Sequence, residues 1–473
     1  MISRREERYL KNISNIKEMK NIRMNPFQNK YEWFFLNIEN TYLSKNNWEK
    51  IVLDILNEYD DFGIMYILDK LFEINTELYD SVEKMLKRNN HTLFKTHKLF
   101  EEFDIKSQLH PKFLMLRDNE EFLYHRKILE NWFEGFQDRD GKIIKEFQTT
   151  FHSSFWEFFL FKIFKDLNFD IDFSKNRPDF ILKKKKNKDI YVEATTANIK
   201  MDGRKENKRN LEDILGMVTP PSMNEDFDVE INESIIRYSN SICNKLQKYK
   251  NEYINLDWID KENPYVIALS SFSQVNYGRE YIHGIIALLY GIIYSKDSKE
   301  FIVKESVQKN KNVNIQLGIF NKKEYSDVSA IIFSSNITIG KLSALVKSEI
   351  SYNKQEVFTL YQDFIDDEIK FKVNRVSQES KEVLTDGIWV FHNPNAKNKL
   401  ALSDFDDLGI TNFINKNQEL YVFGNLNPTI SRLDIPNVCC HKYFPRIMGM
   451  VEKYNAENFN FVNYYLIPEN KNM

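Results

Sequence analysis

The chain of 473 residues contains little cysteine, glycine or proline and no long apolar run. Its three cysteines, Cys243, Cys439 and Cys440, are too few for a disulfide framework and favour a reducing compartment. Only 14 glycines and 11 prolines are present, which argues against disorder and for many helices. No stretch reaches the roughly 20 apolar residues of a membrane-spanning helix, and the charged start lacks an apolar signal segment. The composition therefore predicts a cytoplasmic protein with no membrane contact.

Aromatic residues, in contrast, are abundant. The 37 phenylalanines and 24 tyrosines supply ample apolar surface for a sizeable core. Because a chain of this length exceeds a single core, we expect several domains. Helical spacing of apolar residues predicts a helical region over 1–140, and alternating helices and strands predict an α/β region over 141–275. A second α/β region, with no role indicated by its sequence, is expected over 276–473.

The central region has a definite order of predicted elements. A long apolar helix over 145–169 comes first, and a second amphipathic helix covers 231–253. Three short strands lie between the two helices and a buried strand follows the second one; these strands are expected at 169–173, 179–183, 190–195 and 264–272. The prediction is thus a mixed sheet flanked by helices, in the order helix, three strands, helix, strand.

The segment 179–195, DFILKKKKNKDIYVEAT, is predicted to form a hairpin that brings two carboxylates together. If its turn centres near Lys186, Asp179 lies opposite Glu193 on one face, and the apolar residues Phe180 and Val192 face each other on the other. Directly opposed like charges are destabilising. A divalent cation with oxygen ligands would compensate them, whereas two solvated surface acids are the ordinary alternative.

Glu157 is a third candidate acid. It lies within FHSSFWEFFLFKIF, a segment that is apolar on nearly every face, so its helix is expected to be buried. An ionised carboxylate there is costly unless it is paired or bound to a metal. A salt bridge at a polar edge of the helix is the alternative interpretation.

These residues resemble the PD-(D/E)XK nuclease superfamily, which has the restriction-endonuclease-like fold. The resemblance covers about 146–272: Pro178-Asp179 matches the PD, Glu193 matches the (D/E), and Glu157 matches a glutamate that many members carry on the first core helix. It implies an endonuclease that hydrolyses phosphodiester bonds. By the resemblance, Asp179 and Glu193 bind Mg²⁺ or Mn²⁺, and Glu157 orients water or a second ion.

The sequence departs from the family at the lysine. Thr195 stands two residues after Glu193, where the family has the lysine that assists the chemistry. In some members this lysine migrates to a neighbouring element; here Lys245 is the first candidate and Lys200 the second. The alternative is a degenerate nuclease that binds nucleic acid, or serves as a scaffold, without cutting.

A basic segment surrounds the hairpin. Residues 174–210 carry twelve lysines and arginines against five acids, a local balance of +7 in a protein of net charge −3. Such a segment suits a phosphate backbone. Arg177 and Lys183, Lys184, Lys185 and Lys186 are the predicted nucleic-acid contacts. A solvated hairpin tip in a lysine-rich protein is the competing interpretation.

Three other motifs carry weaker signals. His152 and Ser153 precede Glu157 on the predicted helix and are candidates for phosphate contact, although helix-end polarity is the simpler explanation. The CCHK motif at 439–442 has no partner pair with zinc spacing, so free thiols are expected. The NITIGK motif at 336–341 lacks the P-loop frame and predicts a strand-to-helix turn, with an anion site at the helix start left open.

The sequence thus predicts a metal-dependent nuclease that acts on nucleic acid, DNA before RNA. An enzyme for another phosphate ester is a further alternative. Analogy at the level of fold suggests restriction or phage defence. The flanking regions are candidates for contacts with a second copy of the chain or with a partner protein.

Overall fold

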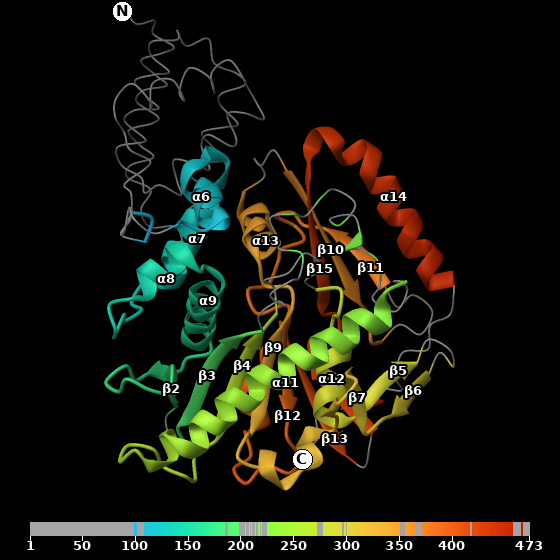
Figure 1. Ribbon diagram of the computed structural model, residues 1–473. Helices are drawn as coiled ribbons and strands as arrows, with labels where there is room; N and C mark the ends of the chain where they lie inside the picture. Colours follow the sequence, from blue (N-terminus) through green and yellow to red (C-terminus); the bar gives the residue numbers. More distant parts are fainter. Residues whose placement is uncertain are drawn as a thin grey trace, which may run out of the picture. The chain divides into compact units, whose positions relative to one another are not determined.

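The computed structural model describes most of the chain beyond residue 98 (Figure 1). The described residues are 99–101, 108–184, 188–197, 204, 208, 210, 213, 216–217, 219, 225–271, 278–295, 298, 300–350, 355–365, 371–416, 419–456 and 465–466. All of the described helices and strands belong to one of the chain's two compact units, which contains 98–349 and 353–473. Residues 1–98 of the helical region predicted over 1–140 lie outside the described residues.

A nine-stranded mixed sheet forms the centre of this unit (Figure 1). Its strands, in sheet order, are β1 (Asp170–Ile171), β2 (Phe180–Lys183), β3 (Ile190–Thr196), β4 (Tyr265–Ser270), β9 (Ala330–Ser334), β12 (Ile388–His392), β13 (Ile410–Lys416), β14 (Glu419–Gly424) and β16 (Tyr465–Leu466). Strands β1, β2 and β3 pair antiparallel, whereas β3, β4 and β9 run parallel. The chain is thus an α/β protein, as the sequence predicts.

Helices cover both faces of this sheet. They are α6 (Pro111–Asp118), α7 (Leu123–Phe133), α8 (Ile143–Thr149), α9 (His152–Asp166), α11 (Phe227–Asn251), α12 (His283–Tyr290) and α13 (Ile339–Glu349). Helix α9 precedes the first three strands and α11 lies between β3 and β4. The predicted order of helix, three strands, helix, strand is therefore confirmed.

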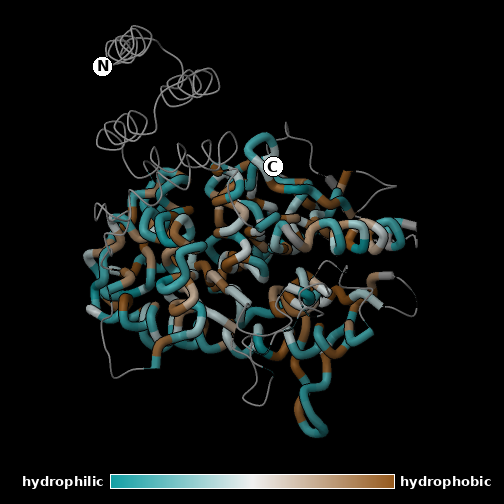
Figure 2. The backbone as a smooth tube through the Cα atoms, turned by 90° about the horizontal axis from the view of Figure 1, so that it is seen from above, coloured by the Kyte–Doolittle hydropathy of each residue, from teal (hydrophilic) through white to brown (hydrophobic). Residues whose placement is uncertain are grey.

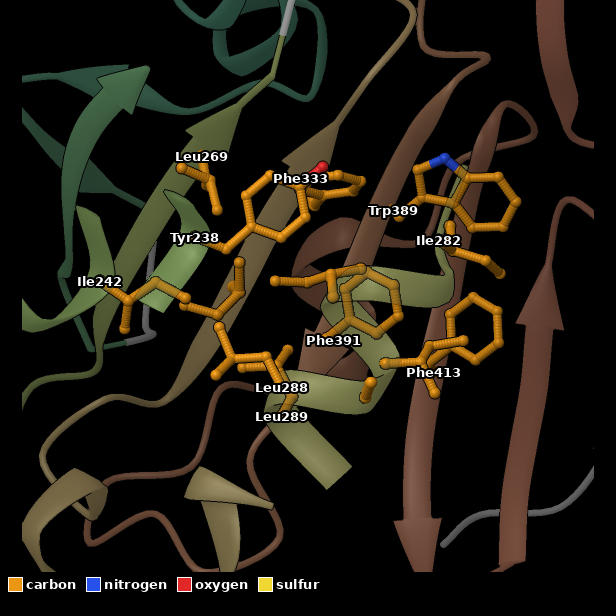
Figure 3. Packing of buried hydrophobic residues seen from close by; sticks show 14 of the residues in the cluster. Tyr238, Ile242, Leu269, Ile282, Leu288, Leu289, Phe333, Trp389, Phe391 and Phe413 are labelled. Atoms are coloured by element: carbon orange, nitrogen blue, oxygen red, sulfur yellow. The ribbon is translucent and has the colours of Figure 1, made fainter. Parts of the chain in front are cut away.

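Alternation along the strands divides the core between the two faces. On one face, Ile267 and Leu269 of β4 pack with α11 and α12. Figure 3 shows this cluster, in which Tyr238 of α11 and Leu288 of α12 lie against Phe333 and Phe391 of the sheet. On the other face, the intervening residues of β4 pack with α7, α8 and α9. Hydrophobic and hydrophilic segments accordingly alternate along the chain (Figure 2).

The single long helix predicted over 145–169 is wrong, because the chain breaks at Phe151. This residue has a φ of 61°, in a region that L-residues rarely adopt, and it separates α8 from α9. The hydroxyls of Thr149 and Thr150 donate to the carbonyls of Lys145 and Glu146, four residues earlier. Such back-bonding bends helices, and the buried Phe151 ring then packs against Phe147 and Phe155.

The large sheet continues past residue 275 into the C-terminal region. Five of its strands come from residues 330–466, so the predicted central region and part of 276–473 share one sheet. A separate three-stranded antiparallel sheet has the order β11 (Phe371–Arg375), β10 (Gln355–Gln362), β15 (Thr429–Pro436), and helix α14 (Asn437–Ala456) packs on it. The described residues also form two small hairpins: β5 (Ile292–Ser295) with β6 (Glu300–Val303), and β7 (Ser306–Asn310) with β8 (Val313–Gln316).

None of the helices in the described part of the chain combines the length and the apolar character that crossing a bilayer requires.

Candidate active site

The β2–β3 hairpin brings Asp179 and Glu193 together. Phe180 pairs with Val192 and Leu182 with Ile190, which confirms the register predicted from the sequence. Asp179 directly precedes β2, and its Oδ2 accepts a hydrogen bond of 2.8 Å from the main-chain N–H of Ala194. This bond fixes the carboxylate of Asp179 beside the strand that carries Glu193.

Arg139 holds the segment before β2 in place. It lies in the turn between α7 and α8, and its guanidinium donates to the carbonyls of Lys175, Pro178 and Asp179. The bonds to Pro178 and Asp179 measure 3.2 and 3.0 Å. The guanidinium therefore fixes the main chain of Asp179 from a turn about 40 residues away.

Glu193 is the most enclosed of the three candidate acids, with an exposed fraction of 1%. Its Oε1 accepts from Lys245 Nζ at 2.9 Å and from Lys248 Nζ at 3.2 Å, both on α11. The hydroxyl of Tyr253 donates to the same oxygen at 3.0 Å. The other oxygen, Oε2, is buried and has no hydrogen-bond partner among the described residues.

Glu157 reaches this group from α9, on the other face of the sheet. Burial raises the pKa of Glu157 well above its usual value, and the negative charge of Asp179 raises it further. Lys245 opposes this shift, and Glu193 adds to it. The four side chains therefore sense one another's charge, so the sequence-predicted set of Glu157, Asp179, Glu193 and Lys245 lies in one neighbourhood.

The pKa values of the two hairpin acids are driven in opposite directions. Burial raises the pKa of Asp179 to about 6, and the charge of Glu193 contributes to this. Burial alone would raise the pKa of Glu193 too, but Lys245 and Lys248 hold it below its usual value. Near neutral pH, Glu193 is thus ionised, and Asp179 is close to the range in which it takes up a proton.

The carboxylate oxygens of Asp179 and Glu193 are chemically suited to bind a divalent cation. Carboxylate oxygens are the ligands that Mg²⁺ and Mn²⁺ prefer, and no described residue gives the buried Oε2 of Glu193 a hydrogen bond that would offset its desolvation. Across the described ranges, however, no three His, Cys, Asp or Glu side chains are gathered closely enough to form a ready metal site. Any ion would thus be held chiefly by Asp179 and Glu193.

The remaining residues of the predicted site have different positions. Thr195 lies half-buried on β3, two residues beyond Glu193 on the same strand. Lys200 lies outside the described residues. Arg177 donates to Glu252 at 2.7 Å, and its guanidinium lies over the ring of Tyr253, which itself contacts Glu193.

The predicted lysine turn is partly neutralised by nearby acids. Lys183 pairs with Asp172 at 2.7 Å, and Lys184 Nζ lies 3.8 Å from a carboxylate oxygen of Asp404. Lys185 and Lys186 lie outside the described residues. The +7 balance counted along the sequence therefore overstates the charge that Lys183 and Lys184 can offer to a ligand.

The weaker motifs are separate from the acids of the hairpin. His152 is buried in the first turn of α9, with its ring against His110 and Phe151, and Ser153 follows it. The predicted strand-to-helix turn at 336–341 is confirmed, since β9 ends at Ser334 and α13 begins at Ile339.

Two further motifs, NITIGK and CCHK, lie in the C-terminal region. The Nζ of Lys341, in the NITIGK motif, is fully buried and bonded to Glu382. It is therefore not available to an anion at the start of α13. Cys439 and Cys440 of the CCHK motif are free thiols on α14.

Sequence reasoning missed Lys248 and Tyr253, both of which contact Glu193. Lys248 follows Lys245 by three residues, a spacing that puts both on one face of α11. That spacing could have identified Lys248. Tyr253 lies beyond the end of α11, and its contact depends on how the helix crosses the sheet, which no sequence pattern indicates.

Comparison with protein-family models, with characterised proteins and with solved structures finds no match to this chain.

Proposed function

We propose that the protein is a metal-dependent nuclease of the PD-(D/E)XK type, and that Asp179 and Glu193 form the site at which nucleic acid is cut. The observation that carries this proposal is the position of Lys245. Its ammonium group lies 2.9 Å from Glu193 Oε1. A cation thus stands beside the acids, although Thr195 occupies the family's lysine position.

The order of elements supports the proposal. An acid directly before the second strand and another on the third strand meet across an antiparallel pair, with a helix glutamate nearby. The proposed catalytic core is therefore α9, β1, β2, β3, α11 and β4, extended by further strands of the same sheet.

Each residue of the site has a distinct role in this proposal. Asp179 and Glu193 would hold Mg²⁺ or Mn²⁺, with the carbonyl of Ala194 as a further oxygen ligand. When bound, the ion lowers the pKa of water and neutralises charge on the scissile phosphate. Glu157, whose carboxyl group keeps its proton to higher pH, orients water by hydrogen bonding. Lys245 supplies a positive charge at the phosphate.

A second candidate is a nucleic-acid-binding protein that does not cut. Two ammonium groups and a hydroxyl already compensate Oε1 of Glu193, as in a structural ion cluster. Asp179 would then face Glu193 without a metal between them. Metal-dependent cleavage separates the two candidates.

The proposal is tested by incubating the full-length protein with supercoiled plasmid DNA and with single-stranded RNA. We expect Mn²⁺ or Mg²⁺ to produce cleavage of nucleic acid that EDTA abolishes. Cleavage in EDTA would exclude the metal-dependent mechanism. If no nucleic acid is cut with any metal, the non-cutting candidate replaces the nuclease. Hydrolysis of a simple phosphate monoester that excess DNA does not inhibit would favour another phosphate substrate.

Substituting Lys183, Lys184, Lys185 and Lys186 by Ser should weaken nucleic-acid binding and flatten its salt dependence. Each lysine that contacts a phosphate contributes roughly one unit to the slope of log affinity against log salt. Because Lys183 and Lys184 already have acidic neighbours, we expect the slope to fall by about two units rather than about four. Fluorescence anisotropy at several salt concentrations measures both quantities.

A matched variant separates a local effect from a change in net charge. Lys304, Lys309, Lys311 and Lys323 are exposed and lie away from the hairpin. Their substitution by Ser alters the net charge equally and should leave affinity nearly unchanged. Equal losses in the two variants would mean that the lysine turn is an ordinary solvated tip.

A further inference from the structure

A polar cavity lies on the three-stranded sheet of the C-terminal region, away from the hairpin acids. Its volume is about 420 Å³, within the usual range for small-molecule sites of roughly 300–1,000 Å³. Side chains from one face of the sheet form its floor. Thr359 and Tyr361 of β10 alternate with core residues, and they pair across the sheet with Asn374 of β11 and Thr429 of β15.

The two faces of this sheet differ in chemistry. On one face, Phe358 and Leu433 pack against Ile447 of α14. At one end of the opposite face, Val357 packs against Ala344 of α13. The rest of that face carries the hydroxyl and amide groups of the cavity floor. This polar part of the face is bordered by loop residues, among them Ser380 and Asn425, and the cavity lies above it.

The charges of the cavity disfavour an anion. Glu382 and Asp386 line it, whereas the cations that neutralise them, Lys341 and Arg432, are not part of the lining. The only cation in the lining is Lys381, and its Nζ is 3.1 Å from Glu349. A phosphate would therefore find no unpaired cation in the lining. Nor do the described residues form a metal cluster.

Three polar groups of the floor remain open for a ligand. The hydroxyls of Thr359 and Tyr361 have no hydrogen-bond partner among the described residues, nor does the amide nitrogen of Asn374. The oxygen of Asn374 accepts from Ser380 at 2.9 Å, which orients its NH₂ group. These groups both donate and accept hydrogen bonds, and the Tyr361 ring adds a flat aromatic surface. Leu408, 89% exposed, supplies an apolar rim.

We propose that this cavity binds a single unpaired nucleobase of the nucleic-acid substrate. A base is neutral, presents donors and acceptors along its edge, and stacks on aromatic rings. The choice of a base over another neutral polar molecule rests on the proposed function. The C-terminal region would then select where the nuclease acts, by admitting a base that is not paired.

The test uses metal-free full-length protein and the four ribonucleosides, observed by saturation-transfer NMR. We expect base protons to receive saturation, and inorganic phosphate and methyl glucoside not to compete. Thr359→Val keeps the shape of the side chain and removes only the open hydroxyl, so it should reduce affinity without unfolding. Tyr361→Leu removes the stacking surface and should reduce affinity by about tenfold or more. Tyr421→Phe on β14 is the control and should change nothing.

The outcomes distinguish this site from the proposed nuclease. Nucleoside binding that both variants weaken would support the cavity, even if the protein cuts nothing. Binding that neither variant alters would overturn it, and so would the absence of nucleoside binding, whether or not the protein cleaves. Tight binding of the glucoside in place of nucleosides would also overturn it, because the ligand class would be wrong.

Discussion

Lys245→Ala should reduce the rate of cleavage by about 10²–10³ while Mn²⁺ still binds, because a charge aimed at the transition state commonly contributes that much. Glu193 keeps two partners in this variant, Lys248 and Tyr253, so its carboxylate stays in place. Thr195→Lys in the same background should restore part of the activity, since Thr195 follows Glu193 on the same strand. Single-turnover cleavage and calorimetry measure the two effects.

Two lysines of the same helix provide the comparison. Lys248 also contacts Glu193, but 40% of its side chain is exposed, against 22% for Lys245, so Lys248→Ala should cost less. Lys250 bonds to the carbonyl of Glu324 and should be neutral when replaced by Ala. Full activity in Lys245→Ala would exclude Lys245 as the missing cation and shift attention to Lys200.

Asp179→Asn should abolish measurable Mn²⁺ binding and leave the fold intact. The amide oxygen of the variant can still accept the hydrogen bond from Ala194 N. Mutating a residue that hydrogen-bonds to a metal ligand typically lowers metal affinity by about 10–100-fold. Loss of a direct ligand should therefore lower it by at least about 100-fold. Calorimetric titration with Mn²⁺ measures this loss. Asp170→Asn, an exposed acid on β1, is the control and should bind normally.

The same variant should be more stable than the parent when no metal is present. The folded pKa of Asp179, about 6, exceeds the unfolded value of 3.8, so its ionisation opposes folding as pH rises from about 4 to 6. Above about pH 6 the ionised carboxylate of Asp179 lowers the free energy of unfolding by its full amount. Removing this charge should raise the free energy of unfolding by at most about 3 kcal/mol. The gain should vanish below about pH 4. Unchanged stability at both pH values, measured by thermal unfolding, would show that neither burial nor the charge of Glu193 raises the pKa of Asp179 in the folded protein.

The hairpin was predictable because its alternation leaves only one register that buries Phe180 and Val192 on the same face. Lys245 was predictable as a candidate because the family resemblance allows the missing lysine to lie on a neighbouring element, and Lys245 lies on the next helix of the core. Tyr253, the partner of Glu193 beyond the end of that helix, was not predictable, because its contact depends on the crossing of helix and strand and joins residues 60 apart. No local pattern encodes that crossing.

Other features depend on contacts between distant segments. Strands β9 and β12 consist of buried residues, but no local pattern indicates that β9 pairs with β4 and with β12. The break at Phe151 reverses a strong helical pattern, because hydroxyl back-bonding and the burial of one ring outweigh the propensity of the segment. The polar cavity likewise unites β10, β11 and β15 from three separate stretches of chain.

The most direct test of the proposed site is a crystal of the full-length protein soaked in Mn²⁺ and measured for anomalous scattering. The proposal predicts a peak within bonding distance of the carboxylates of both Asp179 and Glu193, and its absence in crystals of Asp179→Asn. A peak elsewhere, or none at Mn²⁺ concentrations that support cleavage, would contradict the assignment of these acids as the metal site.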